Sequence, residues 1–330
     1  MWAAASSAIV RPVRFPVPPA ERIVLVAGPT AAGKTALSVA LAEAVGAEIV
    51  GADSRQVYRR MDAGTAKPTR AERERVKHHM IDVVQPDACF DVATWREGAM
   101  HAIGEIRARG RHVIVCGGTG LYLRSLMRGL FEGPARAPAL RARLEGQEKR
   151  EPGSLHRQLG GVDPAAAERI HPNDLVRIVR ALEVLELTGE PISAWQARHA
   201  LSERPFETLT LEVTLEREQL AARIDRRARD IVDAGLVEEL AALRADGFAS
   251  DLEAFGAIGY REAGLCLDGR LPIEDLAAMI AAATRRYAKR QLVWLRGQME
   301  TEPVPSGDVD RALARVRGFL HGMESGAGTG

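Results

Sequence analysis

The residues best suited to chemistry lie near the amino end, where Gly28-Pro29-Thr30-Ala31-Ala32-Gly33-Lys34-Thr35 follows the apolar residues 23–27. This is the GxxxxGK[ST] pattern of a phosphate-binding loop between a strand and a helix. Glycines let backbone N–H groups turn toward an anion, and the start of a helix adds its dipole. Lys34 adds a positive charge, and Thr35 adds a hydroxyl suited to Mg²⁺. The spacing therefore predicts a site for a di- or triphosphate with magnesium.

Two further polar positions follow strands that we predict over residues 48–52 and 112–116. Asp53 follows the first strand, at the edge where open α/β sheets bind ligands, although an isolated aspartate there would also suit a cap or a turn. The second strand runs into Gly117-Gly118-Thr119-Gly120, where a nucleotide hydrolase would often place a second acidic residue for Mg²⁺. The pattern therefore indicates polyphosphate binding without a usual hydrolytic group, and it leaves the Thr119 hydroxyl available to a phosphate or a second substrate.

The composition limits the kinds of partner. The chain has 330 residues, of which 46% are hydrophobic, enough for one large domain or two modest ones. Its 45 basic and 44 acidic residues leave a net charge of +1, so any nucleic-acid-binding surface must be a local patch. No run of about eighteen apolar residues occurs, so we expect no membrane contact.

Cysteine and histidine spacing bears on compartment and metals. Cys89, Cys116 and Cys266 are scattered and lack the spacing of a zinc site or a disulfide framework, which favours a reduced, cytoplasmic setting. The adjacent His78 and His79 lack the i, i+4 spacing of a helical metal site, so we expect them in a loop or in the core.

The order of patterns predicts an α/β fold: a P-loop parallel-sheet core, similar to nucleoside triphosphate hydrolases, with a helical insertion domain. The predicted segments are a disordered extension over residues 1–21, the core over 22–133 and 204–300, the insertion over 134–203, and a linker, a short dispensable helix and a flexible tail over 301–330. Periodicity predicts helices over 140–149, 164–170, 175–187, 216–243 and 275–295, and a strand over 206–215.

Arginines are frequent in the predicted insertion. Arg177 and Arg180 share a helical face, where they could form ion pairs with Glu183 and Glu186. Beside a diphosphate site, a basic helical domain more plausibly holds a large anion such as an RNA backbone.

A second basic cluster lies over residues 284–291. It fits nucleic acid, yet Tyr287, Val293 and Trp294 fit a buried core equally well, and both interpretations stay open.

Taken in order, the motifs closely resemble those of bacterial tRNA dimethylallyltransferases, also called tRNA isopentenyltransferases, over residues 22–300. Besides the phosphate loop, the matching motifs are Asp53-Ser54-Arg55-Gln56-Val57-Tyr58, Met61-Asp62-Ala63-Gly64-Thr65-Ala66-Lys67-Pro68, Gly117-Gly118-Thr119-Gly120-Leu121-Tyr122, Ile170-His171-Pro172-Asn173-Asp174, Arg180-Ala181-Leu182-Glu183, Ile258-Gly259-Tyr260-Arg261 and Ala288-Lys289-Arg290-Gln291 with Trp294. Arg60 departs from the pattern, because many relatives carry a small residue there.

The resemblance implies a reaction. Dimethylallyl diphosphate would donate its prenyl group to the exocyclic amine of the adenosine immediately 3′ of the anticodon, and diphosphate would leave. It implies catalytic roles for Asp53, Thr119 and Arg227, with Asp53 taking the amine proton and Arg227 stabilising the leaving group. The loop would bind the diphosphate, and Thr35 would lie beside Mg²⁺.

The resemblance also implies contact with the tRNA anticodon stem-loop at two sets of residues. These are Asp53, Ser54, Arg55, Gln56, Thr119, Gly256, Ala257, Ile258, Gly259, Tyr260 and Arg261 in the core, and Arg141, Val176, Arg177, Ile178, Val179 and Arg180 in the insertion. We expect a monomer, since no extra apolar interface stands out. The alternatives are a P-loop small-molecule kinase, a prenyltransferase acting on free AMP, and an RNA-binding nucleotide switch.

Overall fold

The computed structural model describes residues 21–130, 133–198 and 204–321. Two compact units are present, which we call the α/β unit and the helical insertion. The compact unit that contains the insertion starts at Arg128, and the boundary at residue 134 stays a prediction. Of the extension predicted over residues 1–21, residues 1–20 lie outside the described residues, and Glu21 is the first residue of β1. Residues 322–330 of the segment predicted over 301–330 also lie outside them.

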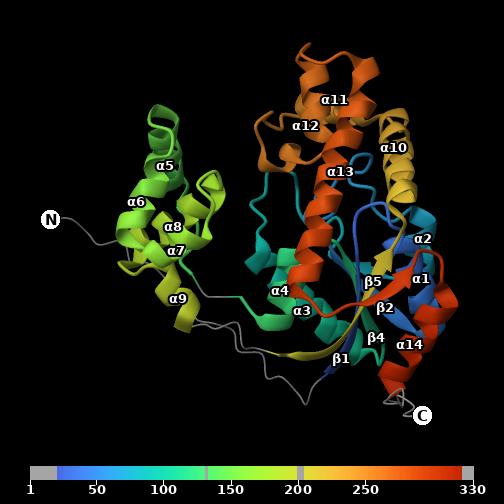
Figure 1. Cartoon of the computed structure of the whole chain (residues 1–330). Helices are drawn as coiled ribbons and strands as arrows, with labels where there is room; N and C mark the ends of the chain where they lie inside the picture. The colour runs from blue at the N-terminus through green and yellow to red at the C-terminus, as the bar shows by residue number, and fades with distance from the viewer. Residues whose placement is uncertain (1–20, 131–132, 199–203, 322–330) are drawn as a thin grey trace. The chain divides into compact units, whose positions relative to one another are not determined.

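One parallel sheet organises the α/β unit (Figure 1). In the described part of the chain it has six strands in the order β3-β2-β4-β1-β5-β6. The strands are β1 (Glu21–Ala27), β2 (Ala47–Ala52), β3 (His78–His79), β4 (His112–Gly117), β5 (Phe206–Thr214) and β6 (Glu302–Pro305). The predicted α/β class and the strands predicted near residues 23, 48, 112 and 206 are confirmed. His78 and His79, expected in a loop or the core, instead form β3 and pair with β2.

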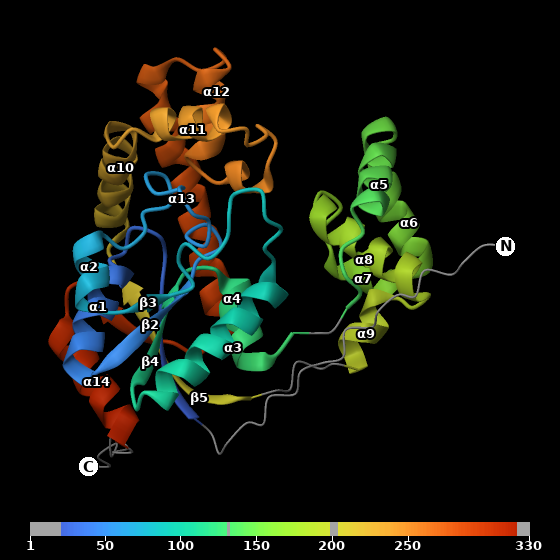
Figure 2. The ribbon, with the colours of Figure 1, turned by 180° about the vertical axis from the view of Figure 1, so that it is seen from behind.

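Alternation along β1 shows how the sheet is covered on both faces. Ile23, Leu25 and Ala27 pack into one hydrophobic cluster, whereas Val24 and Val26 pack into another, and all five are fully buried. Strands buried on both faces are typical of parallel sheets between helical layers. Figure 2 shows α1 and α14 on one side of the sheet and α3 and α4 on the other.

In the α/β unit, helices occupy the chain segments between the strands and after β6. They are α1 (Lys34–Val45), α2 (Arg70–Arg75), α3 (Val92–Ala108), α4 (Gly120–Arg128), α10 (Arg217–Asp233), α11 (Leu236–Ala245), the 3₁₀ helix η1 (Glu253–Gly256), α12 (Tyr260–Leu267), α13 (Ile273–Gln298) and α14 (Val309–His321). Gly46 ends α1 with a φ of 68°, a left-handed conformation that glycine accepts readily. Among the described residues, no helix combines the length and apolar character that a membrane span requires.

The carboxyl end of the chain corrects one prediction. The segment taken for a linker forms β6, which pairs with β5, and the helix taken as dispensable is α14, whose Ala312 and Val316 are fully buried against the sheet cluster that includes α1. The two prolines of β6, Pro303 and Pro305, concealed the strand because proline normally interrupts a ladder. An edge strand tolerates proline, since one side of its backbone has no partner strand.

The helical insertion has its own hydrophobic core. Its helices are α5 (Pro138–Arg150), α6 (Ser154–Val162), α7 (Pro164–Arg169), α8 (Leu175–Thr188) and α9 (Ile192–Arg198). Leu144, Leu155, Leu159 and Leu182 are fully buried within it. The three helices predicted in this segment are confirmed as α5, α7 and α8.

Candidate active site

The phosphate loop, residues 28–35, joins β1 to α1 and adopts backbone angles that few residues accept. Gly33 has a φ of 97° and Gly28 a φ of 140°, and a Cβ at Gly28 would lie 2.9 Å from the carbonyl oxygen of Val213. Only glycine fits such a position. Lys34 and Thr35 then begin α1, whose first N–H groups lack partners within the helix. The loop is therefore shaped to present donors to an anion.

A cavity of about 430 Å³ opens beside this loop. It is lined by residues of the loop itself, of the segments after β2 and β4, of α10 and of α13. Those that bear on function are Thr30, Ala31, Gly33, Lys34, Thr35, Asp53, Gln56, Gly118, Arg223, Arg226, Arg227, Tyr287 and Gln291. The cavity thus brings together the loop, Asp53 and Arg227, which the sequence placed far apart. Gly28, Pro29 and Ala32 are buried in the loop's interior.

Lys34 is the loop's positive charge. Its Nζ donates a hydrogen bond to the carbonyl oxygen of Pro29 at 2.7 Å. Burial lowers the pKa of Lys34 to about 8, although Cys116 and Asp53 act in the opposite direction; Arg227 adds to the lowering. A bound diphosphate would favour the charged form of Lys34, so the site favours binding of an anion.

Arg227 comes from α10 on another side of the cavity. Burial lowers the pKa of its guanidinium, and the charge of Asp53 opposes that shift. Within the described residues, no carboxylate lies within ion-pair distance of Arg227. A second positive charge, without an ion-pair partner from the described protein, therefore lines the same cavity as Lys34.

Asp53 follows β2 and is held by its own turn. One carboxylate oxygen accepts hydrogen bonds from the N–H groups of Arg55 at 2.8 Å and Gln56 at 3.3 Å. The turn that the sequence left as an alternative is therefore present, and Asp53 also lines the cavity. A structural turn and a reactive carboxylate are compatible here, because the other oxygen is not used by the turn.

Thr119 links the ends of β2 and β4. Its N–H donates to the carbonyl of Ala52 at 3.2 Å, and its hydroxyl oxygen accepts from the N–H of Ser54 at 3.1 Å. Burial and the nearby Asp53 raise the pKa of Tyr287 to about 12, against the effect of its hydrogen bond with Thr119. Thr119 is thus hydrogen-bonded to the turn of Asp53 and lies near Tyr287 of α13.

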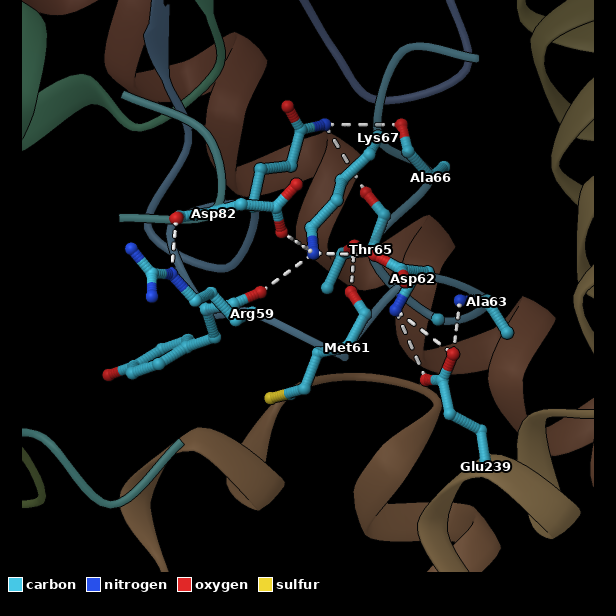
Figure 3. A network of polar contacts seen from close by, with 12 residues as sticks. Arg59, Met61, Asp62, Ala63, Thr65, Ala66, Lys67, Asp82 and Glu239 are labelled. Atoms are coloured by element: carbon cyan, nitrogen blue, oxygen red, sulfur yellow. Dashed lines mark hydrogen bonds and ion pairs between the residues drawn. The ribbon is translucent and has the colours of Figure 1, made fainter. Parts of the chain in front are cut away.

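The segment over residues 61–68 forms part of the cavity wall and is held by polar contacts (Figure 3). Lys67 Nζ donates to the carboxylates of Asp62 at 2.7 Å and Asp82 at 2.5 Å and to the carbonyl of Tyr58 at 2.7 Å. Its side chain is only 3% exposed. On the other side, Glu239 accepts from the N–H groups of Asp62 and Ala63. The motif therefore has a structural explanation.

Gln56 and Arg60 flank that segment. The Gln56 amide donates to the carbonyls of Thr65 at 3.3 Å and Ala66 at 3.1 Å, so its side chain shapes the wall. Arg60 has a φ of 64°, the left-handed conformation that suits a small residue. Its guanidinium pairs with Asp246 and lies over the ring of Phe248, which compensates for the departure from the pattern.

The remaining predicted RNA contacts of the α/β unit divide by burial. Arg55 donates to the carbonyl of Glu253 at 3.1 Å, and the Arg261 side chain is 57% exposed. In contrast, Ala257 and Tyr260 are buried, and the Tyr260 hydroxyl donates to Glu239. Gly256 ends η1 just before Ala257, Ile258 lies between the two buried residues, and Gly259 precedes α12 with a φ of 97°. The side chains of Ala257 and Tyr260 are thus structural.

The predicted contacts of the insertion divide in the same way. The side chain of Arg177 is 72% exposed and Val176 is 74% exposed, whereas Ile178 and Val179 are 1% exposed and belong to the hydrophobic core. Arg141 and Arg180 both pair with Glu183, which is fully buried. A contiguous stretch of helix points in all directions, so the side chains of Ile178 and Val179 belong to the core of the insertion. Contact between the segment 176–180 and RNA stays a prediction.

Two residues of α13 that line the cavity were not assigned a role from sequence. Tyr287 and Gln291 are four residues apart, so they share a helical face, a spacing that could have revealed them. The sequence left open whether Tyr287 contacts nucleic acid or is buried in the core. Because Tyr287 lines the cavity, neither interpretation describes it fully. Val293 is 65% exposed rather than core, and Arg285, Arg286, Lys289 and Arg290 are exposed.

Comparison with known proteins identifies relatives. The model of the IPP transferase family matches residues 56–298. The chain is 49% identical to a tRNA dimethylallyltransferase of Geobacter metallireducens over 91% of this chain and 98% of the relative, and 50% identical to one of Anaeromyxobacter dehalogenans over 89% and 98%.

Solved structures agree with this. A tRNA isopentenylpyrophosphate transferase of Bacillus halodurans superposes with a TM-score of 0.68 and 37% identity over 92% of this chain and 96% of its own. A eukaryotic dimethylallyltransferase acting on tRNA gives a TM-score of 0.78 and 26% identity over 92% and 81%. Because the family match spans most of the chain and the relatives are covered over nearly their full length, the chain belongs to the IPP transferase family.

Proposed function

We propose that the protein transfers the dimethylallyl group of dimethylallyl diphosphate to the exocyclic amine (N6) of the adenosine immediately 3′ of a tRNA anticodon. The observation that carries this proposal is the single cavity lined by the phosphate loop, Asp53 and Arg227. β4 ends there in Gly117, and Gly118 rather than an acidic residue follows it, which suits a departing diphosphate better than nucleotide hydrolysis. The bacterial relatives are named tRNA dimethylallyltransferases, which supports the same activity.

Charge separation explains the site's composition. As the allylic C–O bond breaks, its electron pair goes to the diphosphate, and the carbon becomes cation-like. Lys34, Arg227 and the amides of the loop stabilise the negative charge where it develops. The lone pair of N6 forms the new C–N bond at the same carbon.

Asp53 accepts the proton that N6 must lose. It lines the cavity with the phosphate loop, and its turn fixes its direction. General-base assistance of this kind typically contributes roughly 10²–10⁴-fold. Because an adenine amine is a weak nucleophile, holding it against the allylic carbon supplies much of the remaining acceleration.

We place Mg²⁺ beside Thr35. Among the described residues, no three His, Cys, Asp or Glu side chains gather into a metal site. That fits Mg²⁺, which protein sites often hold through phosphate oxygens and water with few protein ligands. When bound, the ion neutralises charge on the diphosphate.

For the RNA, the target base must leave its stack to reach a cavity. Arg55 and Arg261 in the α/β unit and Val176 and Arg177 in the insertion are the partly or well exposed members of the predicted contacts. We propose that they contact the anticodon stem-loop, and that the enzyme acts as a monomer in the cytoplasm.

Mass spectrometry tests the reaction directly. An anticodon stem-loop is incubated with the protein, Mg²⁺ and dimethylallyl diphosphate, and the expected result is a gain of one C₅H₈ unit on the adenosine. A gain on free AMP instead would identify an adenylate prenyltransferase. Transfer of the γ-phosphate from labelled ATP to a small molecule, with no prenyl product, would identify a kinase.

A further inference from the structure

Gln291 of α13 connects two loops of the cavity through a single amide group. Gln291 is only 8% exposed. Its Oε1 accepts the N–H of Thr30 at 2.8 Å, and its Nε2 donates to the carbonyl of Gly118 at 3.0 Å. The amide therefore ties the phosphate loop to the turn after β4.

The space between Gln291 and Gly118 holds this hydrogen-bonded connection and no additional side chain at residue 118. A Cβ on Gly118 would lie 2.1 Å from Gln291 Nε2, a contact that real side chains do not tolerate. A carboxylate in the same place would lack the donor that the Gly118 carbonyl requires, and a thioether would lack both groups. The geometry thus requires a long side chain with an acceptor and a donor at its end.

The same helical face reaches the other half of the site. One turn before Gln291, Tyr287 lines the same cavity, and Thr119 acts to lower the pKa of the Tyr287 hydroxyl. The hydroxyl oxygen of Thr119 accepts from the N–H of Ser54. Ser54 follows Asp53, so α13 contacts the loop that would hold the diphosphate directly, and it reaches the turn that orients Asp53 through the segment after β4. One rigid helix thus sets the positions of loops that follow different strands.

We propose that Gln291 is a positioning residue, which fixes the phosphate loop relative to the turn after β4 that carries Thr119. Through the hydrogen bond between Ser54 and Thr119, that turn is in contact with the turn of Asp53. This inference rests on the proposed function, because it concerns the alignment of an allylic diphosphate with a nucleobase amine. Two reactants held in a near-attack geometry gain a large rate advantage, and a misplacement of about 1 Å can cost roughly 10²-fold. Gln291 acts through backbone groups and does not itself touch the reacting atoms.

The test compares Gln291→Met, which preserves length but removes both polar groups, with Gln219→Met, a matched change at an exposed position of α10. Steady-state kinetics are measured for tRNA and dimethylallyl diphosphate, together with binding of Mg²⁺–pyrophosphate and thermal unfolding. For Gln291→Met we expect kcat to fall about 10- to 100-fold with KM for tRNA unchanged. We expect pyrophosphate affinity to fall about threefold to tenfold, as for loss of one hydrogen bond. Gln219→Met should match wild type.

Other outcomes overturn the inference. Values of kcat and pyrophosphate affinity within about twofold of wild type would show that the connection has no positioning role. A lower unfolding temperature with unchanged kinetics of the folded enzyme would make Gln291 purely structural, and a rise confined to KM for tRNA would make it an RNA contact. If wild type forms no prenyl product, the proposed function fails, while pyrophosphate binding still decides whether Gln291 organises the loop.

Discussion

Buried charges in the insertion and in the cavity differ in what neutralises them. In the insertion, Glu183 is fully buried and accepts from both Arg141 and Arg180, at 2.8 Å each, and from the N–H of Ala137. In the cavity, Lys34 donates to a backbone carbonyl, and Arg227 has no carboxylate within ion-pair distance among the described residues. A buried charge with protein partners serves the fold, whereas one without them is prepared for a ligand.

The pKa values follow the same division. Burial alone would raise the pKa of Glu183, but the hydrogen bonds from Arg141, Ala137 and Arg180 outweigh it and lower the pKa to about 2. For Lys34, burial dominates and lowers the pKa to about 8. Glu183 therefore stays charged at neutral pH because the insertion supplies its counter-charges, while Lys34 is close to losing its proton until an anion arrives.

The largest expected effect comes from changing Asp53, and Glu183 is the carboxylate of the insertion with which it is compared. Asp53→Asn keeps an oxygen for the N–H groups of Arg55 and Gln56 but removes the proton acceptor. We expect single-turnover prenyl transfer to fall by roughly 10²–10⁴-fold with tRNA binding unchanged. Glu183→Gln is the matched change in the insertion and should lower stability while leaving the rate of the folded enzyme intact. Comparable rates for the Asp53→Asn and wild-type enzymes would remove the cavity side of the comparison.

A pair of arginine substitutions follows. Arg227→Met removes stabilisation of the leaving group, so we expect kcat to fall by roughly 10²–10³-fold, with little loss of stability because no ion pair is broken. Arg141→Met leaves Glu183 with fewer donors and should lower the free energy of unfolding by about 2–3 kcal/mol. Hydrogen exchange of the α8 amides measures the second effect, and kinetics the first. Interchanged results, with Arg227 stabilising and Arg141 catalytic, would invalidate the distinction.

How much of this was accessible from sequence depends on the distance between interacting residues. The phosphate loop, α1 and its glycine cap follow from neighbouring residues, and four strands follow from apolar runs bounded by turns. β6 did not, because Val304 stands alone between Pro303 and Pro305 and the strand forms only by pairing with β5. Local patterns cannot reveal an element whose partner is distant in the chain.

The site shows the same limit. Asp53 was singled out by its position after a predicted strand and Arg227 through family resemblance, and the structure places both on one cavity. Gln291 was named only within a basic motif, since its contact with Thr30 spans 261 residues. Ile178 and Val179 were named within a predicted RNA-contacting segment, and helical periodicity, applied to α8, would have assigned their side chains to its buried face.

The pH dependence of substrate capture tests the charge on Lys34. In the free enzyme its pKa is about 8, so above that pH the loop loses a positive charge. We expect kcat/KM for dimethylallyl diphosphate to fall by up to about tenfold per pH unit there, whereas kcat stays level because bound diphosphate retains the proton. Lys34→Arg, with its permanent charge, should flatten the profile at a lower level.

Lys34 also affects stability, with the opposite sign. Its pKa is lower in the folded protein than the ordinary value of 10.5, so between about pH 8 and that value the unfolded chain binds more protons. Its contribution to the free energy of unfolding therefore rises with pH through this window. A parallel fall of stability and kcat/KM above pH 8 would point to general unfolding instead, and circular dichroism across the same range distinguishes the two.

The smallest expected effect concerns the exposed face of the insertion. The side chain of Arg177 is 72% exposed, and its contact with Asp174 is long, at 3.4 Å, so it contributes little to the fold. Arg177→Gln should weaken binding of the stem-loop and reduce by about one the slope of log affinity against log salt concentration, as expected for one lost phosphate contact. Fluorescence anisotropy at several salt concentrations measures both. Arg157→Gln is a suitable control, because Arg157 is also exposed and paired, with Glu151, but lies on α6, outside the predicted contacts. Equal slopes for all three proteins would show that exposure in the insertion, unlike the missing counter-charges of the cavity, does not identify a binding surface.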